Sequence, residues 1–346
     1  MDFESLYPSS AKYIFANGLR KVEPYEFSYL ANTKARWASM RSITDVFTTE
    51  FKRRCDRDMI VKAIQDGRIL VNDVGVQPSH RVCQGDLICT RSVHRHEPAV
   101  PDWPIEIAQQ EDGLLVVDKP HGLPVHPNSL YYFNTLLTIL RKDMALDPRL
   151  QLVHRLDGLT SGIVILADPD KRPKLFEAFE KRLLQKVYVA RVQGRFPEQK
   201  ITCNIPLHTP EGKGSGRQVV ARHGKPTETI FHRIRYDANG DYSIVQCILH
   251  TGRRHQIRAH LSLLGYPILN DPLYNDAYPA SRRLNQMHTD SLSIDYPLWP
   301  DAKHTCQLCS HPAPDPDPLH MAIDLRAVLY AGKGWRYQSM WPAWAN

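Results

Sequence analysis

The stretch HRLDGLTSG at residues 154–162 places a single carboxylate among groups that could hold or activate it. Asp157 follows Arg155 by two positions, so in an extended segment the two side chains point the same way. Asp157 could act as a nucleophile or a general base, and Arg155 could bind a phosphate or hold a base. The same residues also suit an Asx-type turn that leads into the apolar run GIVILA. On residue types alone both interpretations stay open, and the turn is the commoner one.

Tyr188 lies in KVYVARVQG at 186–194, a stretch whose β-branched and aromatic residues predict a strand. A tyrosine in such a strand is usually a core or surface aromatic. It can also be a stacking platform for an unpaired base, an interaction worth ~1–3 kcal/mol. The residue type alone does not decide between these roles.

A third stretch, HTGRRHQIRAH, concentrates positive charge within a helix predicted over 253–265. On that helix Arg254 and Arg258 are four residues apart and share a face, with His255 beside Arg258. A basic helical face is most often simply solvated. This one follows a Thr251–Gly252 turn, and helix N-termini in such a position bind phosphate.

The composition suits a folded protein. The chain has 346 residues, 42% of them hydrophobic and 23% charged, enough for two domains or one large domain with extensions. Its net charge of +7 suits a polyanionic partner better than a neutral one. The seven cysteines are an odd number, and the N-terminal MDFESLYPSS has no apolar run, so we expect a reduced compartment. No run approaches the ~20 apolar residues that span a bilayer. We expect a cytoplasmic protein, with nuclear and organellar locations left open.

The first 98 residues predict a small module of helices and strands. KARWASMRSITDVFTTEFKRR has helical spacing, and DMIVKAIQDGRILVN predicts a short helix ended by Gly67 and then a strand. GDLICTRSVHRHE predicts a second strand. This order of helix, glycine, strand with asparagine, and GD pair resembles a fragment of the S-four-like RNA-binding module. A generic helix–strand unit has the same pattern.

After the proline-rich linker EPAVPDWP at 97–104, strands and helices do not alternate regularly. LLVVDKP, GIVILA, KVYVARV and YSIVQCILH predict strands, and KRPKLFEAFEKRLLQ predicts an amphipathic helix over 171–185. This mixture favours an α+β fold with a mostly antiparallel sheet over a doubly wound fold. We predict three parts: 1–98, 99–296, and an extension at 297–346. The aromatic end of the extension should pack on the body, because exposed tryptophans are costly.

Five segments together resemble the pseudouridine synthases that modify large-subunit ribosomal RNA and tRNA. They are VDKPHGLPVHP, HRLDGLTSG, KVYVARVQG, GKPTET and TGRRHQIRAHLSLLGYPILNDPLY, in the family's order over residues 112–275. The flanks, such as TRSVHRHEPAV, are similar to the eukaryotic branch that acts on tRNA, with the plant-type enzymes most alike. The resemblance implies the pseudouridine synthase fold, with a mixed central sheet flanked by helices and the catalytic domain at 99–296. The isomerisation needs no redox step or group carrier, so no cofactor is implied.

The resemblance also implies roles for single residues. Asp157 is the essential catalytic residue, acting as a nucleophile or as a base toward the ribose. Tyr188 stacks on the extruded uracil and helps to remove the proton from carbon 5. Arg258 pairs with Asp157 and keeps the carboxylate ionised and oriented. Arg155 fills the gap left by the flipped base, and Ile257 lines the pocket beside it.

Three further residues, Arg254, His255 and Lys119, are predicted to contact RNA. Arg254 stands where the family usually has threonine or serine, and Thr227 where alanine is common. We expect RNA as the partner, tRNA before other RNAs, and a monomeric protein without a membrane segment. The alternatives are a non-catalytic RNA-binding protein, ribosomal or other RNA as substrate, and a carboxylate-dependent glycosidase. The absence of an obvious partner acid in the sequence disfavours the glycosidase.

The stretch HTCQLCSH has metal-ligand spacing. Cys306 and Cys309 have the separation of zinc ligands, and His304 and His311 lie close to them in the sequence. A second CxxC pair is missing from the sequence. We therefore favour two thiols in a loop over a structural metal, and predict no metal site.

Overall fold

The computed structural model describes residues 8–38, 42–50, 57–128, 130–210, 217–221, 223–279, 309 and 314–346. The chain divides into two compact units, and the main border falls between Pro98 and Ala99. The first unit contains Lys21–Pro98 and flanking residues from both ends of the chain. The second unit contains Phe15–Arg20, Ala99–Gln286 and Pro316–Asn346. None of the helices in these described ranges combines the length and the apolar character that crossing a membrane requires.

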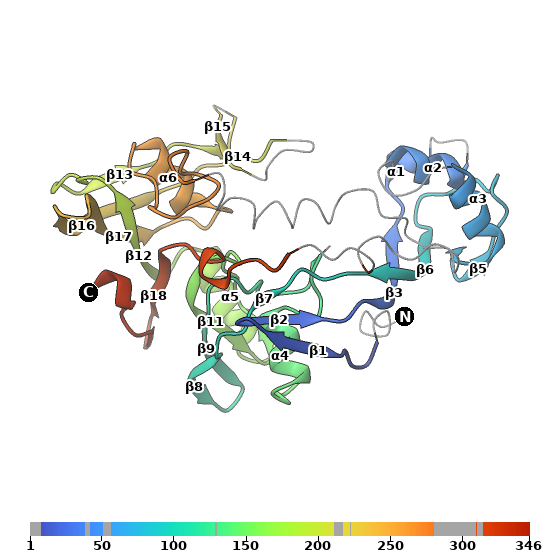
Figure 1. The fold of residues 1–346 in the computed structure, drawn as a ribbon, viewed down its shortest axis with the longest axis horizontal. Helices are drawn as coiled ribbons and strands as arrows, with labels where there is room; N and C mark the ends of the chain where they lie inside the picture. Colours follow the sequence, from blue (N-terminus) through green and yellow to red (C-terminus); the bar gives the residue numbers. More distant parts are fainter. Residues whose placement is uncertain are drawn as a thin grey trace. The chain divides into compact units, whose positions relative to one another are not determined.

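The first unit combines a small antiparallel sheet with short helices (Figure 1). Its described elements are α1 (Ala35–Ala38), α2 (Ile43–Glu50), α3 (Arg57–Gln65), β3 (Tyr25–Asn32), β4 (Ile69–Val71), β5 (Val74–Gly75) and β6 (Leu87–Arg95). The strands follow the order β3-β6-β4-β5. Trp37, Phe47, Ile60 and Ile88 share one apolar cluster, so the helices bury their faces on the sheet.

The region predicted as one long helix contains both α1 and α2. The hydroxyl of Ser42 accepts a hydrogen bond from the backbone N of Asp45 at 3.2 Å. Ser42 is therefore the N-cap of a separate helix, α2. A single continuous helix is therefore wrong for this stretch. The last four residues of this stretch, from Phe51 on, lie outside the described residues.

The glycine, asparagine and GD pair of the predicted module are joined by hydrogen bonds. Gly67 follows α3 with a φ of +69°, a value that favours glycine. The Asn72 side chain accepts from the backbone N of Leu87 and donates to Asp86, both at 2.9 Å. Asp86 also accepts from the backbone N of Cys83 at 2.6 Å. These bonds tie the β4–β5 turn to the start of β6, while the assignment to the S-four-like module stays a prediction.

The second unit is built on a ten-stranded sheet, in which β13-β16-β17-β12-β18-β11-β9-β8 follow one another and β10 and β19 pair at the side. The strands are β8 (Glu106–Glu111), β9 (Leu114–Lys119), β10 (Gln151–Leu152), β11 (Ser161–Ala167), β12 (Gln185–Gln193), β13 (Ile201–Cys203), β16 (Thr229–Asp237), β17 (Tyr242–Leu249), β18 (Leu325–Gly332) and β19 (Trp335–Gln338). All of these described pairs are antiparallel except β11 with β18. The predicted α+β class with a mostly antiparallel, mixed sheet is confirmed.

Smaller strand pairs complete the described part of the chain. They are β1 (Tyr13–Ala16) with β2 (Leu19–Val22) and β7 (Val100–Pro101), and β14 (Leu207–His208) with β15 (Val219–Val220). Strand β7 lies inside the stretch predicted as a linker, where Val100 pairs with Arg20. That stretch is extended, as its prolines require, but part of it is hydrogen-bonded rather than solvated.

The helices of the second unit are α4 (Leu136–Lys142), α5 (Arg172–Glu180) and α6 (Gln256–Leu263), with the short 3-10 turns η2 (Pro318–His320) and η3 (Ala343–Ala345). Helices α4 and α6 bury Leu140 and Leu261 in the same core as β9, β11, β12 and β17. Helix α5 has no fully buried residue, because only Leu175 and Phe179 of its predicted apolar stripe pack on the core. Phe176 is 42% exposed, so the stripe is narrower than predicted.

Strand β18 comes from the segment predicted as a C-terminal extension. It lies between β12 and β11, inside the sheet (Figure 1, red). Strand β19 pairs with β18, and Trp335 stacks on Tyr337 there with ring centroids 5.1 Å apart. The residues from Pro316 on therefore build the sheet itself, and the predicted division at 296/297 does not coincide with a border between compact units.

Candidate active site

The HRLDGLTSG stretch forms most of the loop between β10 and β11, and its last two residues, Ser161 and Gly162, begin β11. Gly162 has a φ of +112°, and a Cβ atom there would lie 2.2 Å from the carbonyl oxygen of Ala327 on β18. Only glycine permits this approach of two backbones. The backbone N of Thr160 donates to the carbonyl oxygen of Asp157 at 3.1 Å. Asp157 therefore opens a tight turn whose end is fixed against a neighbouring strand.

His154 anchors the start of this loop. Its Nε2 accepts from the backbone N of Ile165 on β11 at 3.2 Å, and its ring stacks on Phe179 with centroids 4.6 Å apart. Burial lowers the pKa of His154 to about 3. The ring is therefore neutral at physiological pH and keeps the lone pair that the hydrogen bond from Ile165 needs.

Lys119 braces the loop from inside the core. Its side chain is fully buried, and Nζ donates to the carbonyl oxygens of Pro120 at 2.7 Å, Leu123 at 2.8 Å and Gly158 at 3.0 Å. An ammonium has three donors, and these bonds use all of them. Burial lowers the pKa of Lys119 to about 7, against the opposing effect of the Asp157 charge. The prediction that Lys119 contacts RNA is therefore wrong, because neither its surface nor its donors are available.

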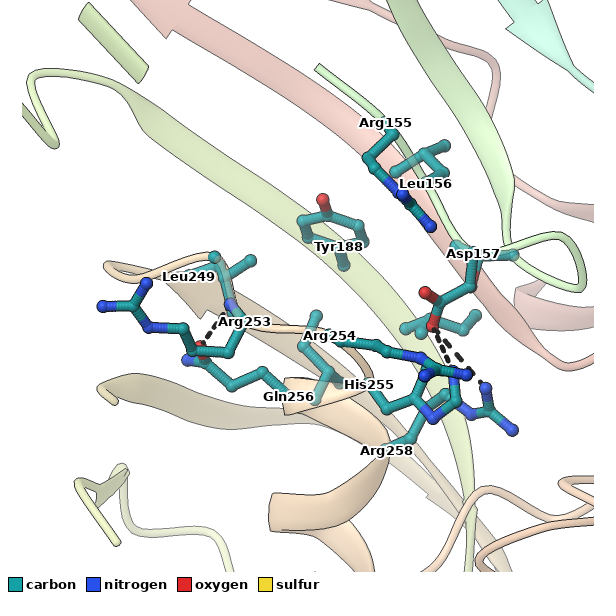
Figure 2. A pocket seen from close by; sticks show the side chains of 14 residues that line it. Arg155, Leu156, Asp157, Tyr188, Leu249, Arg253, Arg254, His255, Gln256 and Arg258 are labelled. Carbon is teal, nitrogen blue, oxygen red and sulfur yellow. Dashed lines mark hydrogen bonds and ion pairs between the residues drawn. The ribbon is translucent and has the colours of Figure 1, made fainter. Parts of the chain in front are cut away.

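Arg258 reaches Asp157 from a position that another acid fixes. Its Nε and Nη2 donate to the two carboxylate oxygens of Asp271 at 2.7 and 2.8 Å. Its Nη1 lies 3.5 Å from Oδ2 of Asp157 (Figure 2). Burial opposes the ionisation of Asp271, but Arg258 and two backbone amides outweigh it and lower the pKa of Asp271. The shorter, bidentate partner of Arg258 is thus Asp271, which the sequence-based prediction did not include.

His255 is the second group beside the Asp157 carboxylate. Its Nε2 lies 3.8 Å from Oδ2 of Asp157, and its Nδ1 lies 3.2 Å from the hydroxyl of Tyr274. Burial lowers the pKa of His255 to about 4, although the charge of Asp157 acts in the opposite direction. At neutral pH the ring is uncharged, so Arg258 is the cation that faces Asp157 directly.

The basic stretch before α6 is a loop rather than part of the helix. Helix α6 begins at Gln256, and His255 precedes it with a left-handed φ of 54°. The predicted helix began within this loop, and that part of the prediction is wrong. Arg254 therefore shares no helical face with Arg258. Both Arg253 and Arg254 are exposed in the loop.

The side-chain amide of Gln256 holds this loop in place. Its Oε1 accepts from the hydroxyl of Thr251 at 2.7 Å and from the backbone N of Arg253 at 3.0 Å. Its Nε2 donates to the carbonyl oxygen of Glu228 at 3.1 Å and to the hydroxyl of Thr229 at 2.9 Å. A buried amide with four partners is rigid. The GKPTET segment thus serves to hold the arginine loop against the sheet.

Tyr188 presents its ring to the same place from β12. It is 7% exposed, and its hydroxyl oxygen lies 2.6 Å from that of Tyr330 on β18. A shift in the β12–β18 pairing falls between Val187 and Tyr188. Burial raises the pKa of Tyr188 well above its ordinary value, and the bond to Tyr330 offsets only part of this. Tyr188 is therefore a neutral phenol with a fixed ring.

Asp157, Tyr188, His255 and Arg258 line one cavity of about 330 Å³ (Figure 2). Among its lining residues, all of which the structure describes, Asp157 carries the single carboxylate, beside four arginines: Arg155, Arg253, Arg254 and Arg258. Leu249, Ile257 and Leu325 supply apolar surface. The size is that of a small-molecule site. The mixture of arginines, an aromatic ring and apolar surface suits a flat ring attached to anionic groups.

Seven of the eight predicted site residues lie at this cavity, and Lys119 does not. Arg155 is exposed at it, with its Nη1 3.3 Å from Nε2 of His126. Asp271 and Tyr274 were missed although both stand in the NDPLY segment, where an acid close after an arginine-bearing helix was the available signal. Tyr330 was missed because its strand was taken for part of an extension.

The chain belongs to the RNA pseudouridylate synthase family, whose model matches residues 113–263. RNA pseudouridine synthase 7 of Oryza sativa subsp. japonica is 37% identical, over 98% of this chain and 93% of its own length. The mitochondrial tRNA pseudouridine(32) synthase of Saccharomyces cerevisiae is 34% identical, over 94% and 77%. Pseudouridylate synthase RPUSD2 of Mus musculus is 40% identical over 80% of this chain. The chain spans about half the length of that mouse relative, 49%.

Proposed function

We propose that this protein converts a uridine of structured RNA to pseudouridine, with Asp157 as the catalytic group and tRNA as the substrate. The observation that carries the proposal is the place of Asp157. It is the single carboxylate of an arginine-lined cavity, 3.5 Å from a buried arginine and beside a fixed tyrosine ring. Membership of the RNA pseudouridylate synthase family supports the same activity.

The proposed reaction rearranges one nucleotide and needs no other reactant. The bond between N1 of uracil and C1′ of the ribose breaks, the base rotates, and C5 bonds to C1′. C5 then loses its proton, and N1 gains one. Asp157 acts either by attacking C1′ or by removing a ribose proton. Both routes require a carboxylate held in place, which Arg258 faces at 3.5 Å and Asp271 supports by fixing Arg258.

The remaining residues of the cavity would hold the displaced base and the RNA backbone. A uridine inside a helix must leave the stack to reach Asp157. Tyr188 offers its ring for stacking, and Ile257 lies beside it as apolar lining. Arg155 is exposed and would occupy the gap in the RNA, while Arg253 and Arg254 suit phosphate contacts.

The choice of tRNA is supported by relatives whose names specify it. Two yeast relatives are named as tRNA pseudouridine synthases, for positions 32 and 31. We assign RNA binding to the N-terminal unit as well, since its Asn72–Asp86 arrangement has the order of the S-four-like module. A monomeric state and a cytoplasmic location stay predictions.

The test uses unmodified tRNA transcripts and detects pseudouridine by its carbodiimide adduct. Asp157→Asn keeps the size of the side chain and removes its charge. We expect it to bind tRNA but to lose at least ~10²-fold in rate. Asp147→Asn, at a partly exposed aspartate of the same unit paired with Arg149, should convert the substrate normally. Normal conversion by Asp157→Asn, or no conversion of any RNA by the wild type, would rule the proposal out. Conversion of ribosomal RNA alone would support the proposed reaction but contradict tRNA as the substrate.

A further inference from the structure

Three side chains that can bind a metal lie close together in the first unit. None of them is among the residues used in the proposed reaction. They are His94 near the end of β6, His96 directly after that strand, and Cys309. Their ligand atoms all lie within 4.8 Å of one another. Cys309 is 215 residues from His94 in the sequence, so the fold and not local chain geometry brings these groups together.

The distances from the sulfur suit a shared metal ion. Sγ of Cys309 lies 3.5 Å from Nε2 of His94 and 3.7 Å from Nε2 of His96. A tetrahedral zinc ion has bonds of about 2.3 Å to sulfur and about 2.0–2.1 Å to nitrogen, which separates these two donors by about 3.6 Å. Each sulfur–nitrogen pair therefore already has the spacing of one edge of a zinc tetrahedron.

The strand explains why both histidines are available on one side. Residues two apart in an extended chain point to the same face, so His94 and His96 face Cys309 together. Arg95, between them, is buried, with its guanidinium 4.7 Å above the ring of Phe27. Glu26 is the register partner of His94 on β3. A carboxylate beside a ligating imidazole is a usual second partner in zinc sites.

We infer that His94, His96 and Cys309 bind a zinc ion. Two imidazoles and a thiolate are the donor set that zinc takes in proteins, whereas magnesium and calcium take oxygen donors. The ion would link Cys309 to the end of β6 within the first unit. This replaces the expectation that the sequence holds no metal site. His304, Cys306 and His311 lie outside the described residues, and the site is inferred from the three described donors alone.

The experiment measures zinc on the full-length protein. The protein is loaded with zinc, separated from unbound metal, and analysed by mass spectrometry of the element. We expect about one ion per chain in the wild type and a small fraction of that in Cys309→Ser, His94→Gln and His96→Gln. Cys83→Ser and His80→Gln, an exposed cysteine and a partly exposed histidine of the same unit, should keep the wild-type amount.

Cobalt loading gives an independent readout of the ligands. The wild type should show the intense visible bands of tetrahedral cobalt and a thiolate charge-transfer band, and Cys309→Ser should lose the latter. Circular dichroism of each variant without metal separates lost ligands from lost folding. A chelator should lower the unfolding temperature of the wild type but not of Cys309→Ser.

Two results would contradict the proposed zinc site. Wild-type protein without zinc after loading would mean that the cluster is held only by hydrogen bonds. Full zinc content with an unchanged cobalt spectrum in both histidine variants would place the metal on cysteines without His94 and His96.

Discussion

The two walls of the cavity are held in different ways. We call residues 154–162 with Lys119 the carboxylate wall, and residues 251–258 with Asp271 the arginine wall. The carboxylate wall is fixed by hydrogen bonds between the side chains of Lys119 and His154 and the backbone. The close approach of Gly162 to β18 fixes its end. The arginine wall is fixed by a buried ion pair, Arg258 with Asp271, and by the amide of Gln256.

This difference shows how the Asp157 carboxylate can be placed accurately without a short ion pair of its own. The separation of 3.5 Å between Asp157 and Arg258 is longer than the 2.7 Å between Arg258 and Asp271. Each charged group thus takes its position from its own wall. Asp157, with a side chain 23% exposed, stays accessible to a substrate while the arginine stays in place.

The largest effect should come from removing the ion pair of the arginine wall. Asp271→Asn leaves the fully buried Arg258 without its bidentate partner, and breaking a buried pair from one side costs about 3–5 kcal/mol. Denaturant unfolding should show that loss. Asp276→Asn, at a carboxylate 84% exposed and 3.7 Å from Arg217, should change stability by less than about 0.5 kcal/mol. Equal effects of the two variants would contradict the importance given to burial.

The next effect tests the carboxylate wall through its backbone. Gly162→Ala must accommodate both a φ of +112° and a Cβ atom 2.2 Å from a backbone oxygen, so we expect a loss of about 3 kcal/mol. Gly194→Ala has a φ of +76° and no atom within 4 Å of the added Cβ, so strain alone should cost about 1–2 kcal/mol. Similar losses in the two variants, measured by thermal unfolding, would show that β18 yields to the added methyl group.

A smaller effect should appear in the pH dependence of stability. Burial lowers the pKa of Lys119 from 10.5 to about 7. Between these values the unfolded chain binds the proton and the folded chain releases it, so this residue makes stability rise with pH, by at most about 1.4 kcal/mol per unit. Below pH 7 both states are protonated, and its contribution is constant.

Lys119→Met should remove that rise, seen as a flatter slope of unfolding free energy from pH 7 to 9. The exposed Lys200→Met is the matched control and should keep the wild-type slope. A slope that is the same in all three proteins would mean that the Lys119 ammonium stays protonated in the folded state.

The smallest effect on stability should come from Tyr188→Phe. It removes one hydrogen bond, that to Tyr330, which is worth about 1 kcal/mol. The ring remains, so tRNA binding should be nearly normal, while turnover should fall ~10²-fold or more if the hydroxyl takes part in removing the C5 proton. Unfolding, binding and single-turnover rates measure the three quantities separately. Wild-type turnover would leave Tyr188 with the stacking role only.

Local patterns predicted much of the sheet, because strands such as β11 and β12 each contain three β-branched residues within a short apolar stretch. They could not predict which strands become neighbours, and β18 was placed outside the sheet for that reason. Burial could not be predicted either: Lys119 was predicted to contact RNA, whereas the fold buries its side chain completely. The bidentate contact of Arg258 with Asp271 depends on the chain reversing after α6, which spacing alone does not reveal.

The position of β18 sets an order of events when the ribosome makes this chain. Strands β11 and β12 are consecutive in the sequence, yet they do not pair, because β18 lies between them. More than a hundred residues are synthesised after β12 ends at Gln193 before β18 begins at Leu325. During that time the edges of β11 and β12 that later pair with β18 are unpaired, and unpaired strand edges can associate with other chains. The nascent protein therefore depends on protection of those edges until β18 has been translated.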